Sequence, residues 1–409
     1  MSKYKLCEIG FFKNGLNFSA DKVDSGCKII GIPDFGDKYV ANIDGLKEIN
    51  SEIVTSDYYL KENDILLVRS NGNKNLVGRS MIIGEINEPV SFSGFCIRFR
   101  VTNNQVLPLY VLYLLKSPLF RKLFSNTQQT SISNLNQDIL GNIEFDIPSL
   151  NEQHKIVEIL HSITLKIETN EKINDNLVQQ ITLLYNYWFT QYDFPNDAGQ
   201  PYKSSGGPMI YNDVLGRKIP ATWNVKKLLD VVTWESNSQP PKSEFIYTPR
   251  EGYIRFIQNR DYDSGEYKTY IPLSSNLSIA TKFDILMDKY GDAGAVRYGI
   301  EGAFNVALGK IRVNELKYQE YIRSYLESKW VYSYLHNSCM ASTRASLNET
   351  NLSMLSVVIP EDKVLLKFQK IAHDIRTSIL KTKDENEKLI HLRNWLLPML
   401  MNGQATITD

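Results

Sequence analysis

The sequence predicts an α+β protein with two globular domains in tandem, a pseudo-repeat in which an antiparallel coiled-coil pair of long helices separates the domains. Two observations favour this fold. Two long stretches carry a coiled-coil pattern, and the chain of 409 residues repeats itself with a period of about 215 residues. The predicted segments are domain 1 (1–150), a central helix (151–191), a connector (192–222), domain 2 (223–361) and a C-terminal helix (362–409).

The long helices are predicted from apolar residues that step alternately by four and three positions along residues 152–189 and 364–401. A repeat of 3.5 residues sustained over this length is typical of a coiled-coil seam. Each seam is interrupted by polar residues only in its middle, so antiparallel pairing would bring the two polar segments together. Two independent surface helices are the alternative interpretation. The polar interruptions are Asn170 and Asn174 in the first helix, and Ser378, Thr382 and Glu385 in the second.

The internal repeat is supported by an ordered series of matched segments rather than by any single pair. Asp64-Ile65-Leu66 recurs as Asp284-Ile285-Leu286, and Asn170-Glu171-Lys172-Ile173 recurs as Asn386-Glu387-Lys388-Leu389. Each unit is therefore predicted to be a globular domain of about 150 residues followed by one long helix. The other matched positions are Lys5 to Ile9 with Lys227 to Val231, Leu135-Asn136 with Leu347-Asn348, Leu140 with Leu352, Pro148 with Pro360, and Gln153 with Gln369.

Within each domain, short apolar stretches predict strands, and one longer amphipathic stretch predicts a helix. We expect a twisted mixed sheet with a few helices in each. The predicted strands are residues 29–32, 65–68, 81–83, 95–101 and 143–147 in domain 1, and 253–257, 285–287, 304–308 and 356–359 in domain 2; the predicted helices are 108–124 and 318–335.

The connector is rich in Pro, Gly and Ser, as the segment DFPNDAGQPYKSSGGP shows. This composition is typical of a connecting segment rather than of a core element. A flexible linker is one interpretation. We favour a segment docked on the protein surface, because Phe194, Tyr202 and Tyr211 can anchor it.

Composition indicates an ordinary globular protein and gives no support of its own to nucleic-acid binding. The chain has 46 Lys+Arg and 46 Asp+Glu, whereas a protein that binds DNA alone usually has a basic excess. Counts by segment are 16 against 16 in residues 1–150, and 18 against 16 in residues 208–360. Four scattered cysteines form no CxxC pair, so neither a zinc site nor disulfides are expected. The polar N-terminus and the lack of a long apolar stretch predict a cytoplasmic protein.

Motifs for catalysis are absent or incomplete. Gly72 to Ser80 approaches a P-loop, but it has five residues between its glycines and Arg in place of Lys. The only Pro-Pro, Gln239-Pro240-Pro241-Lys242, lacks the aromatic residue of an adenine methyltransferase motif. Glu361-Asp362-Lys363 is expected to cap a helix start, where acidic residues are favoured. We therefore predict no catalytic residues, no metal site and no cofactor in this chain.

Each domain has two polar loops at matching places, residues 69–74 and 125–131 in domain 1 and residues 289–294 and 338–346 in domain 2. Arg can read guanine and Asn or Gln can read adenine, while Ser, Thr and Lys suit phosphates. Solvated loops without function are the alternative. The candidate DNA-binding residues are Arg69, Ser70, Asn71, Asn73, Lys74, Arg79, Gln128, Gln129, Thr130 and Ser131 in domain 1, and Lys289, Tyr290, Asp292, Arg297, Thr343 and Arg344 in domain 2.

Three segments give the chain a resemblance to the specificity subunits of type I restriction-modification systems. Residues 147–156, IPSLNEQHKI, are similar to the family's entry into its central helix. Residues 185–189, YNYWF, followed by residues 194–207, and the C-terminal residues 392–403 are also typical of it. The second helix departs from the pattern, because Gln369 follows Phe368 rather than a glutamate. The resemblance covers essentially the whole chain.

This resemblance implies two target-recognition domains held apart by an antiparallel helix pair. It also implies double-stranded DNA and two methyltransferase subunits as partners, with S-adenosylmethionine bound by the methyltransferase and possible association of a translocating nuclease subunit. Pseudo-twofold symmetry then predicts a bipartite, asymmetric target whose unread gap is set by helix length. Inserting four residues into one helix is expected to lengthen that gap. A coiled-coil scaffold without sequence readout and a self-contained enzyme are the two alternatives.

Overall fold

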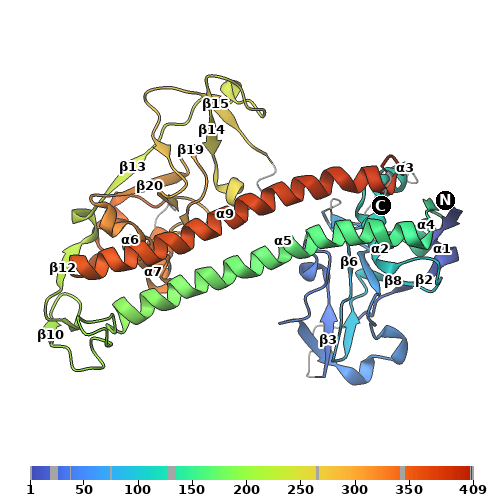
Figure 1. The fold of residues 1–409 in the computed structure, drawn as a ribbon, viewed down its shortest axis with the longest axis horizontal. Coiled ribbons are helices and arrows are strands. Elements are labelled where there is room, and N and C mark those ends of the chain that lie inside the picture. The colour runs from blue at the N-terminus through green and yellow to red at the C-terminus, as the bar shows by residue number, and fades with distance from the viewer. Residues whose placement is uncertain are drawn as a thin grey trace. The chain divides into compact units, whose positions relative to one another are not determined.

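The computed structural model describes residues 2–18, 26–36, 38–73, 76–126, 135–263, 267–340, 346–405 and 407, without the side chains of 123–126 and 340. The chain divides into two units. Unit 1 comprises residues 1–170 and 385–409, and unit 2 comprises residues 171–384. Each unit contains one globular domain and parts of both long helices (Figure 1).

The domain of unit 1 is built on an antiparallel sheet with the strand order β2-β8-β5-β6. All four residues of its central strand β5 are buried. Ile65 and Leu67 face one apolar cluster and Leu66 and Val68 face another, as alternation along a strand requires. The sheet is therefore covered on both faces. Its strands are β2 (Gly10–Asn14), β5 (Ile65–Val68), β6 (Ser80–Ile82) and β8 (Cys96–Val101).

A second, three-stranded sheet in this domain has the order β4-β3-β7, with β3 parallel to β7 and antiparallel to β4. The first and last strands of the domain, β1 and β9, pair antiparallel, so the chain leaves the domain beside the point where it entered. The strands are β1 (Ser2–Lys5), β3 (Gly26–Ile30), β4 (Lys47–Asn50), β7 (Val90–Phe92) and β9 (Glu144–Ile147); short 3-10 segments are η2 (Ile32–Asp34), η3 (Ser51–Ile53) and η4 (Ser56–Tyr58).

The helix predicted at residues 108–124 is broken into two helices at Ser117. Pro118 disfavours helical geometry at the residue before it, and Ser117 has extended backbone angles. The Ser117 hydroxyl donates to the Leu114 carbonyl at 2.6 Å and closes the first helix. The helices are α1 (Leu6–Ile9), α2 (Pro108–Lys116), α3 (Pro118–Asn126) and α4 (Gln137–Gly141).

The domain of unit 2 repeats this topology. Its main sheet has the order β13-β20-β17-β18, its second sheet contains β15-β14-β19 with β16 added, and β12 pairs with β21. The strand β14 is parallel to β19 and antiparallel to β15, as β3 is to its own neighbours. The strands are β12 (Asn224–Lys227), β13 (Val232–Ser236), β14 (Tyr253–Ile257), β15 (Tyr270–Pro272), β16 (Ile279–Ala280), β17 (Ile285–Asp288), β18 (Val296–Arg297), β19 (Gly302–Phe304), β20 (Leu308–Val313) and β21 (Ser356–Ile359).

Two local predictions for this domain are wrong. Residues 304–308 are not one strand, because a turn with Leu308 N donating to Asn305 O separates β19 from β20, which belong to different sheets. Residues 318–335 are not one helix, because the chain is extended at Ser328, whose hydroxyl bonds the Tyr325 carbonyl at 2.6 Å. The helices are α6 (Gln319–Glu327), α7 (Lys329–Met340) and α8 (Glu349–Ser353), with 3-10 segments η7 (Leu228–Asp230), η8 (Lys242–Glu244), η9 (Asn259–Tyr262) and η10 (Leu316–Tyr318).

The two long helices are α5 (Leu150–Tyr185), which continues as a π-helical turn η6 (Asn186–Thr190), and α9 (Asp362–Met401). In unit 1, Ile156 and Leu160 near the start of α5 share an apolar cluster with Leu397 and Leu400 near the end of α9. The coiled-coil prediction is confirmed here, since the start of one helix packs against the end of the other.

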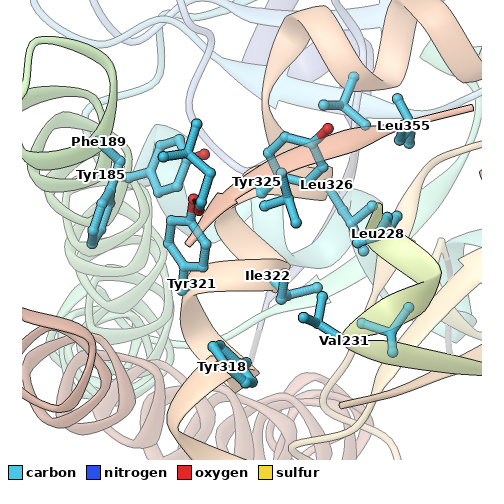
Figure 2. Close-up of a cluster of buried hydrophobic side chains, with 14 of the residues drawn as sticks. Tyr185, Phe189, Leu228, Val231, Tyr318, Tyr321, Ile322, Tyr325, Leu326 and Leu355 are labelled. Atoms are coloured by element: carbon cyan, nitrogen blue, oxygen red, sulfur yellow. Dashed lines mark hydrogen bonds between the residues drawn. The ribbon is translucent and has the colours of Figure 1, made fainter. Parts of the chain in front are cut away.

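In unit 2 the opposite ends meet. Tyr185 and Phe189, at the end of α5 and in η6, pack with Phe368 near the start of α9 and with Tyr321 of α6. Figure 2 shows Tyr185 and Phe189 beside Tyr321 in this cluster. The helices therefore run antiparallel in each unit, and each is part of the core of a globular domain.

The polar middles of the two helices also meet. Within unit 1, Asn170 donates its side-chain amide to Asn386 at 2.8 Å and to Glu385 at 2.9 Å, while Asn386 donates to the Ile167 carbonyl at 3.1 Å. Ile371 and Leu392 are two of the apolar positions that predicted the seam in residues 364–401, and the prediction is wrong there because both side chains are exposed. An α-helix drifts relative to a strict 3.5-residue repeat, so the buried face shifts along so long an element.

The connector is packed on unit 2 at its beginning. Phe194 is buried and stacks on Tyr202 and Trp223, with ring centroids 4.6 and 4.7 Å apart. Tyr211 is 61% exposed on the hairpin of β10 (Met209–Asn212) and β11 (Arg217–Pro220), so its predicted anchoring role is wrong. Across the described part of the chain, no helix has the length and apolar character that crossing a membrane requires.

Candidate nucleic-acid interface

The first candidate loop begins at the same structural position in both domains. The Arg69 amide donates to the Phe95 carbonyl at 2.8 Å, and the Arg69 carbonyl accepts from the Leu135 amide at 2.8 Å. Lys289 repeats both bonds, donating to Ala307 at 2.8 Å and accepting from Leu347 at 3.0 Å. Arg69 and Lys289 are therefore equivalent, each in a backbone frame of three chain segments.

The loops also end alike. Gly78 donates its amide to the Val68 carbonyl and Gly294 donates to the Asp288 carbonyl, both at 2.9 Å. Both glycines have positive φ, +81° and +96°, a conformation that other residues adopt only with strain. The loop between these fixed ends covers residues 69–77 in domain 1 but only 289–293 in domain 2, so equivalent frames carry loops of different length and sequence.

In domain 1 the loop is partly held by its own polar groups. The Arg69 side chain is half-buried and donates Nη1 to the Gly94 carbonyl at 3.4 Å. The Asn71 side chain accepts from the Asn73 amide at 2.7 Å, which leaves Asn73 exposed at the turn. Ser70 and Arg79 are half-buried. Lys74 lies outside the described residues.

In domain 2 the predicted residues fall into two groups. Tyr290 is 47% exposed and Lys289 is half-buried, so both can reach a ligand in front of the loop. Asp292 accepts from the Tyr332 hydroxyl at 2.6 Å, and Arg297 pairs with Asp288 at 2.8 Å. These two side chains therefore contact the protein itself.

For most of the second candidate loop in each domain, the residues lie outside the described part of the chain. Gln128, Gln129, Thr130 and Ser131 in domain 1, and Thr343 and Arg344 in domain 2, lie outside the described residues. Leu135 and Leu347 follow these segments, and their amides donate to the carbonyls of Arg69 and Lys289. In each domain, the start of the first loop is therefore bonded to a residue that follows the second loop in the sequence.

Phe95 is a candidate contact residue that sequence reasoning missed. Its side chain is 58% exposed, although its carbonyl receives the Arg69 amide. It was predicted to be the first residue of a strand, but β8 begins at Cys96, and Phe95 occupies the turn before it. The preceding Ser93-Gly94 indicates such a turn. An exposed phenylalanine beside a polar loop can contact a thymine methyl group.

The described residues hold no group of three or more His, Cys, Asp or Glu side chains placed to bind a metal ion. The surroundings of Arg69 and Lys289 contain hydrogen-bonding side chains held in backbone frames, and one exposed ring beside each frame, Phe95 in domain 1 and Tyr290 in domain 2. This combination suits recognition of a polar surface.

A family model described as type I restriction modification DNA specificity domain matches residues 2–179 and 220–390, one match for each repeat. The specificity subunit of the type I restriction enzyme MjaIX of Methanocaldococcus jannaschii is 23% identical over 76% of this chain and 72% of its own length. That of HindI of Haemophilus influenzae is 22% identical over 74% of this chain and 78% of its own.

The crystal structure of a type I restriction-modification system S subunit from M. genitalium covers all of this chain and 96% of its own, with a TM-score of 0.61 and 14% sequence identity. This similarity shows a shared fold. The paired domains, the antiparallel helices and the two matches of the family model together show that this chain belongs to the specificity subunits of type I restriction-modification systems.

Proposed function

We propose that each domain reads one half of a bipartite, asymmetric DNA target through its two neighbouring loops. The observation that carries this proposal is the repeated backbone frame at Arg69 and Lys289, in which the start of the first loop is bonded to Leu135 or Leu347, a residue that follows the second loop in the sequence. The frames are the same but the loops differ, so the two half-sites are expected to differ in sequence.

The side chains divide by chemistry into those suited to bases and those suited to phosphates. We propose base contacts for Arg69, Asn71, Asn73, Arg79, Gln128, Gln129 and Arg344, because Arg, Asn and Gln can form paired hydrogen bonds with base edges. Ser70, Lys74, Thr130, Ser131, Lys289 and Thr343 suit phosphate oxygens. Phe95 and Tyr290 are proposed to make apolar or stacking contacts, since both rings are exposed.

We further propose that this chain is not catalytic and that a methyltransferase partner carries S-adenosylmethionine and methylates adenine. Two methyltransferase subunits are expected, one for each half of the pseudo-repeat, with a translocating nuclease as a possible further partner. Exposed apolar side chains on both long helices support protein partners. They include Leu165, Ile173, Val178 and Leu183 on α5, and Leu366, Ile371, Ile390, Leu392 and Trp395 on α9.

The test is a genome-wide map of methylated adenines in cells that contain the methyltransferase, with and without this chain. We expect one two-part motif that disappears when this chain is absent. An unchanged map, together with no sequence preference in a DNA shift assay of the complex, would contradict the proposal and favour a coiled-coil scaffold without readout.

Loop variants identify which half of the motif each domain reads. Asn73→Ala should alter one half and Tyr290→Ala the other, because each lies in the loop of a different domain. Lys218→Ala on the β10–β11 hairpin is the control, since this exposed residue lies outside both candidate loops. A change in both halves from either loop variant would contradict the assignment of one half-site to one domain.

A further inference from the structure

Two equivalent positions of the main sheet carry different chemistry in the two domains. Met81 pairs with Leu66 in domain 1, and Arg297 pairs with Leu286 in domain 2. Val68 and Asp288 are likewise equivalent, since each is the last residue before the loop frame. Domain 1 therefore has two buried apolar side chains, Val68 and Met81, where domain 2 has the ion pair of Asp288 and Arg297.

The Asp288–Arg297 pair extends directly into the first recognition loop. Arg297 donates Nη2 and Nε to one oxygen of Asp288, at 2.8 and 3.1 Å, and its Nη2 lies 3.5 Å from the carboxylate of Asp292. Asp292 in turn accepts from the hydroxyl of Tyr332 on α7 at 2.6 Å. Since α7 leads into the second recognition loop, this chain of contacts connects the supports of both loops.

Stability alone does not explain this ion pair. Asp288 is buried and Arg297 is half-buried, and an ion pair that buries a charge is often no more stabilising than apolar side chains of similar size. Domain 1 folds the same sheet with Val68 and Met81. Burial raises the pKa of Asp288 despite the hydrogen bonds from Arg297. The other carboxylate oxygen of Asp288 is buried without a protein hydrogen-bond partner in the described structure. Burying the charged carboxylate of Asp288 therefore costs free energy.

We propose that Arg297 is a positioning residue that fixes the first recognition loop of domain 2 through Asp288 and Asp292. Tyr332 connects Asp292 to α7 and thereby couples the first recognition loop to the helix that leads toward the second. Lys289 and Tyr290, which lie between the two aspartates, then face DNA with little freedom to adapt to a wrong base. This inference rests on the proposed function and assigns Arg297 to loop geometry rather than to base contact.

The experiment compares two arginines of domain 2 that each pair with a buried aspartate. Arg297→Met and Arg255→Met both leave an aspartate without its partner, because Arg255 pairs with Asp261 at 2.8 Å. Only Arg297 also contacts a residue of the recognition loop. The double variant Asp288→Val with Arg297→Met copies the residues of domain 1 and avoids an unpaired buried charge.

Each variant is expressed with its methyltransferase partner, and the methylated motif and the rate on single-base mismatches are measured. We expect the double variant to fold and methylate, but to lose roughly tenfold or more of its base discrimination in the half-site of domain 2 only. Tyr332→Phe should cause a smaller relaxation of the same half-site. Arg255→Met should lower the yield of folded complex without changing the motif.

Two outcomes would overturn the inference. One is an unchanged motif in the double variant while Tyr290→Ala still alters the half-site of domain 2. The other is equal relaxation in Arg297→Met and Arg255→Met, which would indicate general destabilisation. Failure of the proposed function would differ from both, since the unmodified complex would then methylate no two-part motif.

Discussion

In each unit a globular domain packs against a long helix, and the buried side chains at this junction are of opposite chemical character in the two units. Leu112 and Arg323 are equivalent, because they precede the helix-breaking serines Ser117 and Ser328 by the same number of residues. Counting forward from Gln153 and Gln369, which accept from the amides of Leu107 and Glu320, Leu160 is equivalent to Arg376. Both leucines and both arginines are buried. The junction is thus apolar in unit 1 and ionic in unit 2.

The ionic junction is a network of four charged side chains around one ring. Arg376 binds Glu320 and Glu327 at 2.6 Å each, and Arg323 lies 3.5 Å from Glu320. Both arginines also lie within 5 Å of the ring of Tyr298. Burial lowers the pKa of Arg376, but Glu327 and Glu320 raise it by more, so it stays charged.

One topology can therefore be stabilised by apolar contacts, which need only complementary shape, or by buried charges, which need a complete set of partners. It also predicts that the two units respond differently to the loss of one side chain.

The largest effect is expected for Glu320→Ala. The change leaves two buried arginines without their shared carboxylate, so unit 2 should lose about 3–5 kcal/mol of unfolding free energy. Urea denaturation followed by tryptophan fluorescence measures this, because Trp188, Trp223, Trp234 and Trp330 all lie in unit 2. Glu315→Ala is the control, since its ion pair with Lys317 is more exposed and should contribute about 0–1 kcal/mol. Equal losses would remove the distinction between the ionic network and a surface pair.

Leu160→Ala tests the apolar junction of unit 1. Removing a fully buried leucine leaves a cavity and should cost about 2–5 kcal/mol. Hydrogen exchange resolved by segment should show faster opening of α2 and of the end of α9, both of which contribute to the same cluster. Leu165→Ala, at an exposed position of the same helix, should change little. Similar exchange in the two variants would show that α5 is not part of this core.

Copying the apolar junction into unit 2 should have a smaller effect, of either sign. The variant Glu320→Leu, Arg323→Leu and Arg376→Leu introduces the residues of unit 1, since Leu109 precedes Leu112 by the same number of residues as Glu320 precedes Arg323. The leucines copied are Leu109, Leu112 and Leu160. It removes the three buried charges together and leaves only Glu327, whose side chain is 32% exposed, so the unfolding free energy should stay within about 1 kcal/mol or rise by up to about 4 kcal/mol. A loss as large as that of Glu320→Ala would mean that the network determines the packing of this junction.

The smallest effect concerns pH and unit 1. Burial lowers the pKa of His161 on α5, so the folded state resists a proton that the unfolded state accepts. Above the ordinary pKa of about 6.5 both states are neutral, and the stability of unit 1 should fall as pH drops below that value. The difference between the urea midpoints of unfolding at pH 7.5 and at pH 5.5 should be smaller in His161→Leu than in the unmodified protein. His154→Leu, on the exposed face of α5, should leave the difference as it is.

The candidate interface shows what loop sequences can and cannot specify. The matching places of Arg69 and Lys289 followed from the repeat, since each comes directly after a central strand. The contacts of Asp292 with Tyr332 and of Arg297 with Asp288 could not be predicted from the sequence. They form only when β17, β18 and α7 come together in the fold. Phe95 was missed for the same reason, as its exposure depends on where β8 begins.

The duplicated architecture and the pairing of the long helices could be predicted from periodicity and from the order of segments, because both are local properties that need no knowledge of distant contacts. The meeting of Asn170 with Asn386 follows from that pairing. The burial of Arg323 and Arg376, at the positions of Leu112 and Leu160 in the other unit, depends on the folded arrangement and could not be predicted. A charged side chain on a helix is usually solvated, and only its partners from other elements make burial possible.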